Sequence, residues 1–303
     1  MANDNLSSAK KAKNDEFYTQ FHDIEKELNA YLDFNPDVFR NKTVLLPCDD
    51  PEWSNFTKYF AQRFEALGLK KLISTSYAAT SKPSGIPYQP TLFETDNPQF
   101  DESKTRTRGK IFSLTKDTTG DGVVNVEDLE WEYLEGDGDF RSNEIRALRD
   151  EADIIITNPP FSLFRDFLTW IVAANKDLVI IGNMNAITYK EVFPLISSNK
   201  LWLGATGNGN DMVFRVPEGF EIAPGDREKA ARLGYVGDYT RLGNSCWFTN
   251  IDHGRRHEPL QLMTGVEIVD SIKRSVVLII KNMTVTTQLR SPEQTQFPQI
   301  TKA

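Results

Sequence analysis

Short runs of apolar, often β-branched residues recur along the chain and alternate with amphipathic stretches. Uninterrupted apolar runs are typical of strands buried on both faces, and they predict strands at 43–46, 71–75, 154–157, 178–182 and 201–204. Apolar residues spaced three or four positions apart predict helices at 24–32, 54–67, 142–149, 163–172 and 190–197. This alternation predicts an α/β fold with a doubly wound, mostly parallel sheet.

Three segments fall outside this alternation. Residues 1–14 are polar and rich in lysine, which predicts a mobile N-terminal arm. The core is expected to span 15–217. An inserted acidic loop region is expected at about 78–135, because this region starts with a long stretch that contains several prolines and shows no periodicity. Residues 218–303 form a C-terminal extension, which includes an apolar, strand-like run at 276–280.

The negative charge of the chain is concentrated in the insertion. The whole sequence carries 43 Asp and Glu against 35 Lys and Arg, a formal charge of −8. Residues 94–153 contain 17 acidic and 8 basic residues, so the rest of the chain sums to +1 and does not exclude a polyanionic partner. The basic segment His253–His257 predicts either contact with phosphates or a solvated loop.

The chain shows no sign of export or of a membrane anchor. No stretch approaches the about 18 consecutive apolar residues of a transmembrane helix, and the first residues lack the pattern of a signal peptide. Cys48 and Cys246 have no neighbouring metal ligands, which predicts two reduced thiols. We therefore expect a cytoplasmic protein without a membrane partner. No sequence pattern indicates its oligomeric state.

The most specific pattern is Asn158-Pro159-Pro160-Phe161, directly after the strand predicted at 154–157. Strand ends of doubly wound sheets are where ligands bind. Two prolines fix the backbone and remove two N–H donors, so this loop presents an amide, bare carbonyl oxygens and an aromatic ring. These groups suit a flat base with an amino group, such as adenine or cytosine.

Two further loops carry acidic side chains. Asp49 and Asp50 follow the strand at 43–46 without a glycine-rich phosphate-binding loop, which favours either contact with hydroxyls or an ammonium group, or a solvated turn. In Gly136–Phe140, Asp139 could accept from an exocyclic amine while Phe140 packs on the ring. Glycine and aspartate alone would also predict an ordinary turn there.

Together these blocks resemble the EcoRI family of adenine-specific DNA methyltransferases, within the S-adenosylmethionine-dependent N6-adenine methyltransferases. The resemblance covers most of residues 13–250 and rests on Lys13–Gln20, Cys48–Pro51 with Ser54–Phe56, Gly136–Ser142, Thr157–Phe164 and Ile187–Lys190, in the family's order. It implies a Rossmann-like methyltransferase core, double-stranded DNA as partner, and a C-terminal part that contacts DNA or recognises the target.

The resemblance also implies which residues bind S-adenosylmethionine. From its methionine end through its amino acid or ribose part to its adenine, they are Phe17, Tyr18 and Thr19, then Asp49 and Asp50, then Asp139 and Phe140.

The implied reaction is methyl transfer to N6 of an adenine that is flipped out of a specific DNA sequence, as in restriction-modification or phage-type DNA modification. Adenine N6 is a poor nucleophile because its lone pair is delocalised into the ring, and acceptors for its two hydrogens favour a pyramidal nitrogen. Asn158 and the Pro159 carbonyl would be those acceptors, and Phe161 would recover about 1–3 kcal/mol of lost stacking. The predicted catalytic residues are Asn158, Pro159, Pro160 and Phe161.

A calcium-loop pattern stands apart from this resemblance. Residues 117–128 place glycine at position 6 and the candidate calcium ligands at Asp117, Thr119, Asp121, Val123, Asn125 and Asp128. A helix-like segment, Leu129–Leu134, follows. Threonine at the third position and a short aspartate at the last weaken the calcium hypothesis, and a hairpin or turn is the alternative.

Two other functions are compatible with the sequence. One is a catalytically inactive nucleic-acid-binding protein of the same fold, and the other is a calcium-binding interaction module. Thermal stabilisation by S-adenosylmethionine favours the enzyme, and stabilisation by Ca²⁺ alone favours the calcium module. The inactive protein would bind DNA without methyl transfer.

Overall fold

The computed structural model describes residues 17–47, 49, 54–78, 98–206, 212–216 and 222–259. The expected N-terminal arm, Cys48, Asp50 and the strand-like run at 276–280 lie outside these residues. The described residues up to His257 belong to one compact unit.

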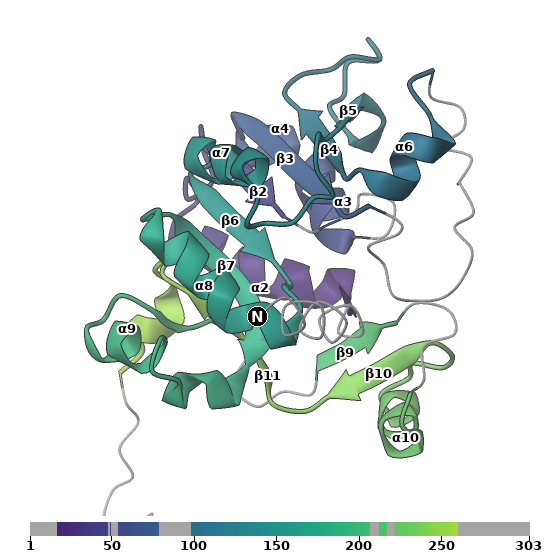
Figure 1. Cartoon of the computed structure of the whole chain (residues 1–303). Coiled ribbons are helices and arrows are strands. Elements are labelled where there is room, and N and C mark those ends of the chain that lie inside the picture. Colours follow the sequence, from purple (N-terminus) through teal and green to yellow (C-terminus); the bar gives the residue numbers. More distant parts are fainter. Residues whose placement is uncertain are drawn as a thin grey trace, which may run out of the picture. The chain divides into compact units, whose positions relative to one another are not determined.

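An eight-stranded sheet in the order β5-β4-β3-β2-β6-β7-β11-β8 forms the centre of this unit (Figure 1). Its four neighbouring parallel strands are β3 (Lys71–Ser76), β2 (Thr43–Leu46), β6 (Ile154–Thr157) and β7 (Asp177–Asn183). Antiparallel pairings add β4 (Lys110–Leu114), β5 (Glu130–Tyr133), β11 (Ser245–Thr249) and β8 (Trp202–Leu203). The predicted α/β fold with a mostly parallel doubly wound centre is confirmed.

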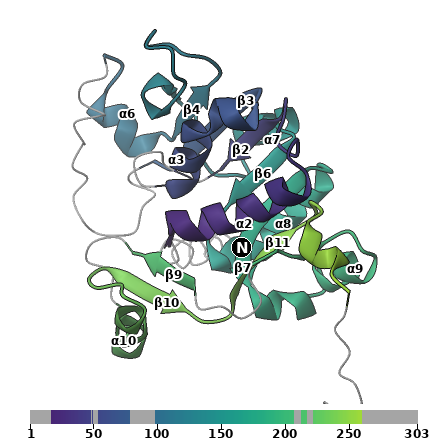
Figure 2. The ribbon, with the colours of Figure 1, turned by 180° about the vertical axis from the view of Figure 1, so that it is seen from behind.

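Helices cover both faces of this sheet. Figure 2 shows α2 (Phe21–Phe34) and α3 (Asn55–Gln62) on one face, and Figure 1 shows α7 (Asn143–Glu151) and α8 (Phe164–Ala173) on the other. Neighbouring residues of each central strand face opposite layers, so Val44 and Leu46 join one buried cluster while Leu45 joins the second. This two-sided burial explains why the central strands are uninterrupted apolar runs.

Local signals set the ends of several helices. The Ser54 hydroxyl accepts from the Phe56 amide at 3.1 Å and begins α3, and Ser142 does the same for α7 through the Ile145 amide at 3.2 Å. Gly68, with φ of 63°, ends the short helix α4 (Phe64–Leu67) that continues from α3. The other α-helices of the described residues are α6 (Glu102–Thr107), α9 (Phe193–Ser197) and α10 (Pro224–Arg232). No described helix combines the length and the apolar character needed to span a bilayer.

A second, smaller sheet brings the first described residues next to the later part of the chain. It has the order β1-β9-β10, all antiparallel, with β1 (Tyr18–Thr19), β9 (Met212–Arg215) and β10 (Tyr239–Leu242). Strands this short and mixed in character carry no strong pattern, and none of them was predicted.

The structure differs from the sequence-based expectation in three places. The expected insertion contributes β4 and β5 to the central sheet, so part of it belongs to the core. The segment Leu129–Leu134 contains strand β5 rather than a helix. Strand β11 lies between β7 and β8, so the core continues beyond the expected boundary at residue 217.

Candidate active site

The candidate site lies where the winding of the sheet reverses. From β2 the chain proceeds to β3 on one side, whereas β6 lies on the other side of β2 and leads to β7. The loops at the carboxyl ends of β2 and β6 therefore diverge and leave a crevice, the usual ligand position in such folds. The Thr157 hydroxyl donates to the Pro47 carbonyl at 2.8 Å and fixes these two ends side by side.

At this point the side-chain amide of Asn158 makes a hydrogen bond to the described residues through its nitrogen but not through its oxygen. Its Nδ2 donates to the Phe17 carbonyl at 2.7 Å, which fixes the orientation of the amide. Its Oδ1 is buried and accepts no hydrogen bond from any described residue. Buried acceptors are nearly always paired, so this oxygen is suited to a donor that arrives with a ligand.

Phe17, whose carbonyl binds this amide, packs its ring against two others. The Phe17 ring lies 5.9 Å from Phe161 and 6.0 Å from Phe214, and Phe161 and Phe214 lie 6.4 Å apart at 88°. Phe214 belongs to β9, where it pairs with Thr19 of β1. The chain thus brings residues 17, 161 and 214 into one apolar wall beside an amide acceptor.

The prolines of the tetrapeptide direct the chain into the next helix. Pro159 is buried, and the Pro160 carbonyl accepts from the Leu163 amide at 2.8 Å. This bond forms a 3₁₀ turn over Phe161–Leu163, and α8 begins at Phe164. The turn fixes the main chain at Phe161, three residues after Asn158.

Asp49 lies at the end of β2 and is 8% exposed. Its Oδ1 accepts from the Ser54 hydroxyl at 2.8 Å, and its carbonyl accepts from the Ser74 hydroxyl. Thr57 and Ser74 are hydrogen-bonded at 3.0 Å, which ties β3 to α3 behind this loop. Asp49 is therefore a fixed carboxylate at the sheet edge, next to the β6 loop.

The loop Gly136–Phe140 lies one strand further along, at the end of β3. The Ala78 amide donates to the Asp137 carbonyl at 2.9 Å, and any side chain at Gly138 would collide with the Ser76 carbonyl. The φ of 88° at Gly138 is also a conformation that favours glycine. The three candidate parts of the cofactor site thus follow one another along the edge in the strand order β3, β2, β6.

Asp139 and Phe140 differ in how they are presented. Burial alone would raise the pKa of Asp139, but the hydrogen bonds and charge of Arg141 outweigh it and hold this pKa below its usual value. The Phe140 ring is buried against Phe167 at 4.8 Å and Trp170 at 5.6 Å. The ring therefore anchors the loop to α8, and almost none of its surface is left exposed for stacking on a ligand.

The structure brings most of the predicted residues to one edge of the sheet. Asn158, Phe161, Asp49 and the segment Phe17–Thr19 meet around the β2–β6 crevice. Asp139 and Phe140 lie at the end of β3, and Asp50 lies outside the described residues. Two further residues complete the site. No sequence pattern indicated Phe214. Asn55 lies in the block Ser54–Phe56 but had no predicted role, and its Nδ2 donates to the Thr19 carbonyl at 2.8 Å. Their contribution depends on contacts with distant parts of the chain.

The predicted calcium loop is folded around its own main chain. Asp117 accepts from the Gly120 and Gly122 amides at 2.6 and 2.8 Å, and Asp121 accepts from the Val123 amide at 2.8 Å. Asn125 and Asp128 cap the following 3₁₀ turn reciprocally. Among the described residues, no group of three or more His, Cys, Asp or Glu is arranged to hold a metal ion.

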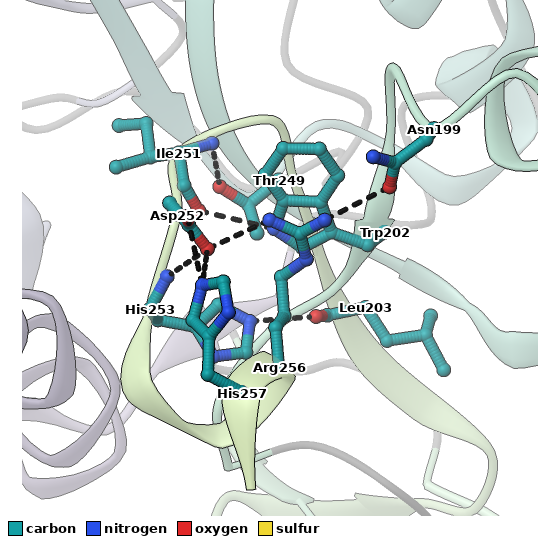
Figure 3. A network of polar contacts seen from close by, with 9 residues as sticks. All are labelled: Asn199, Trp202, Leu203, Thr249, Ile251, Asp252, His253, Arg256 and His257. Carbon is teal, nitrogen blue, oxygen red and sulfur yellow. Dashed lines mark hydrogen bonds and ion pairs between the residues drawn. The ribbon is translucent and has the colours of Figure 1, made fainter.

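The basic segment His253–His257 forms an internal polar network (Figure 3). Arg256 lies over the Trp202 ring at 3.6 Å and donates to Asp252 at 2.7 Å and to Asn199 at 2.8 Å. His257 Nε2 contacts the same Asp252 carboxylate at 2.9 Å. Burial would raise the pKa of Asp252, but its bonds to His257 and Arg256 lower it overall.

This network lies near the amino-terminal end of β7, whereas Asn158 follows the carboxyl-terminal end of β6. Strand β11 runs antiparallel to β7, so its end at Thr249 lies beside the start of β7. The Asn250 Nδ2 accordingly donates to the Lys176 carbonyl at 3.0 Å. The segment therefore lies away from the β2–β6 crevice, and Arg255 and His257 are exposed.

Comparison with known proteins agrees with this geometry. A family model described as "Adenine-specific methyltransferase EcoRI" matches residues 5–269. The chain belongs to this family. It is 41% identical over 258 residues to the Type II methyltransferase M.EcoRI of Escherichia coli, an alignment that covers 85% of this chain and 71% of that relative. It is 34% identical over 260 residues to M.MpnI of Mycoplasma pneumoniae, covering 86% and 67%. No solved structure gives a significant match.

Membership makes this chain an adenine-specific DNA methyltransferase of the restriction-modification type, and the predicted family and enzyme class are confirmed. It implies S-adenosylmethionine as the methyl donor and DNA as the substrate. The crevice between β2 and β6 is the candidate active site of this EcoRI-family enzyme.

Proposed function

We propose that this methyltransferase modifies N6 of an adenine flipped out of a specific duplex sequence, and that Asn158 and the Pro159 carbonyl accept the two N6 hydrogens. The single observation that supports this most is the buried Asn158 Oδ1, which lacks a donor among the described residues. Its amide is held by the Phe17 carbonyl, so the acceptor is already oriented before the substrate arrives. Preorganised polar groups of this kind lower a barrier without reorganisation during the reaction.

The residues at the crevice fit S-adenosylmethionine. The Thr19 hydroxyl is buried and has no hydrogen-bond partner within the described ranges, and it lies on the strand next to Asn158. The Asp49 carboxylate lies on the adjoining loop and suits an ammonium or a hydroxyl group. We assign the methionine end to Phe17, Tyr18 and Thr19, the middle part to Asp49 and Asp50, and the adenine end to Asp139 and the main chain of Phe140.

The reaction then requires little more than alignment. When bound, S-adenosylmethionine supplies a methyl group that is activated on a positively charged sulfonium. Asn158 and Pro159 hold N6 so that its lone pair becomes available, and Phe161 stacks on the flipped base, with Phe17 and Phe214 behind it. Holding two reacting groups at near-attack distance is itself a large source of rate enhancement.

The proposal is tested by incubating the protein with labelled S-adenosylmethionine and mixed-sequence duplex DNA, followed by digestion to nucleosides. We expect label in N6-methyladenine and in no other nucleoside, and sequencing of the modified DNA gives the recognition site. Label in methylcytosine would contradict the proposed target. DNA binding without any label would favour the catalytically inactive alternative.

Calcium binding by residues 117–128 stays a prediction, and Asp128 offers a test of what holds this loop. Hydrogen bonds from the main-chain amides of Asn125 and then Thr119 hold the pKa of Asp128 well below its usual value. Asp128 therefore contributes stability that is fully present above the unfolded pKa of about 4 and is lost as the pH falls through the folded pKa.

We accordingly expect Asp128→Asn to destabilise the protein at pH 7 and to differ progressively less from the wild type below about pH 4. Urea unfolding between pH 3 and pH 7 measures this difference. Repeating the pH 7 measurement with and without Ca²⁺ decides the metal question, because a ligand that binds only the folded state raises its stability. A Ca²⁺-dependent gain that Asp117→Asn removes would support the calcium site, and unchanged midpoints would leave a self-supported turn.

A further inference from the structure

The segment Phe17–Thr19 is held by two side-chain amides. Among the described strands, β1 pairs with β9. The Phe17 carbonyl accepts from Asn158 Nδ2 at 2.7 Å, and the Thr19 carbonyl accepts from Asn55 Nδ2 at 2.8 Å. Carbonyls two residues apart in a strand point to the same side, so the two amides bind the same side of this segment.

Asn55 is placed as firmly as Asn158. It is the first residue of α3, whose N-cap Ser54 binds both the Phe56 amide and the Asp49 carboxylate. The helix buries Phe56, Tyr59 and Phe60 against the core, so its first turn cannot shift freely. A continuous chain of contacts thus runs from Asp49 through Asn55 and the segment Phe17–Thr19 to Asn158.

These contacts determine which end of the Asn158 amide faces the substrate. The Phe17 carbonyl fixes the orientation of the Asn158 amide. It accepts a hydrogen bond from Nδ2, and Oδ1 is thereby left for the substrate. If the segment Phe17–Thr19 moved, the amide could turn over and present its NH₂ to the N6 amine, which needs an acceptor. The bond from Asn55 to Thr19 opposes that movement.

We propose that Asn55 is a positioning residue for methyl transfer: it acts through the carbonyls of Phe17–Thr19 to keep the Asn158 oxygen directed at the target amine. This inference rests on the role proposed above for Asn158. The hydrogen bond that carries this role goes from Asn55 Nδ2 to the Thr19 carbonyl and not to a ligand.

The test uses Asn55→Ala and the isosteric Asn55→Asp in the full-length protein. Asn55→Asp keeps the shape but loses the N–H donor and sets a carboxylate against a carbonyl. In both variants we expect kcat to fall about 10-fold, the size expected for the loss of one orienting hydrogen bond, with KM for DNA and the calorimetric affinity for S-adenosylmethionine nearly unchanged. In the protein without cofactor, amide hydrogen exchange of residues 17–20 should be faster than in the wild type.

Asn250→Asp is the matched control. Asn250 Nδ2 makes the same kind of bond to a main-chain carbonyl, that of Lys176, but near the amino-terminal end of β7. We expect it to lower the melting temperature while leaving kcat per folded molecule and the exchange of residues 17–20 unchanged.

An Asn55→Ala enzyme with wild-type kcat, or one whose loss lies in cofactor affinity alone, would overturn the positioning role. Failure of the underlying function is distinguishable from this result. If Asn158→Ala itself transfers methyl normally, the proposed role of Asn158 is wrong, whereas an inactive Asn158→Ala beside a fully active Asn55→Ala refutes only the inference.

Discussion

Replacing Asn158 with alanine should lower kcat for methyl transfer about 10²- to 10³-fold, the usual cost of removing one preorganised group that acts on the reacting atoms. The substitution removes the buried Oδ1 acceptor and the bond to the Phe17 carbonyl together. Affinities for S-adenosylmethionine and for DNA should stay within a few-fold of wild type, because the cofactor contacts assigned to Thr19 and Asp49 remain. Single-turnover rates and separate binding titrations measure the two effects.

Asn158→Asp separates the two ends of the amide. A carboxylate still accepts from N6 but cannot donate to the Phe17 carbonyl, so its two oxygens and that carbonyl repel one another. We expect activity between those of the wild type and Asn158→Ala. Equal loss of cofactor binding and transfer in Asn158→Ala would show that this residue binds the cofactor rather than the target base.

The position of Asn158 could be predicted because two simple signals agree there. The runs Thr43–Leu46 and Ile154–Thr157 are buried on both faces, which is typical of the central strands of a parallel sheet. Ligands bind at the carboxyl ends of such strands, and the tetrapeptide follows the second run directly. The structure adds that β2 and β6 are neighbours, with Val44 paired to Ile154, so their carboxyl ends lie side by side.

The partners of this site could not be predicted, because their roles come from long-range contacts. Phe214 lies on a four-residue strand, and its ring meets Phe17 only because β9 pairs with β1. The strand Glu130–Tyr133 alternates between exposed and buried positions, and over four residues this pattern is too short to distinguish from one face of a helix. Phe140 looked like a ring for stacking on a base, but α8 supplies the aromatic residues that bury it.

Glu27 is the clearest case of a residue whose importance appears only in the structure. It is fully buried in α2, where a charged side chain is expensive unless it is paired. Its carboxylate accepts from the Tyr31 hydroxyl at 2.6 Å, from the Ala205 and Thr206 amides at 2.8 Å each, and from the Thr206 hydroxyl. Burial and this carboxylate raise the pKa of Tyr31 well above its usual value, so the phenol stays a donor.

Glu27→Ala should therefore destabilise the protein by about 3–5 kcal/mol, because it leaves the Tyr31 hydroxyl and the Ala205 and Thr206 amides without their acceptor, and each unsatisfied buried group costs about 1–3 kcal/mol. For a chain of this size that corresponds to a melting temperature about 10 °C lower. Urea and thermal unfolding followed by circular dichroism measure both quantities. Tyr31→Phe, which removes one of the donors, should cost about 1.5–3 kcal/mol.

Glu25→Ala provides the matched control on the same helix. Glu25 pairs with Arg63, and both side chains are about one third exposed, so its loss should cost less than about 1 kcal/mol. A Glu27→Ala protein as stable as Glu25→Ala would show that the Ala205 and Thr206 amides find other acceptors.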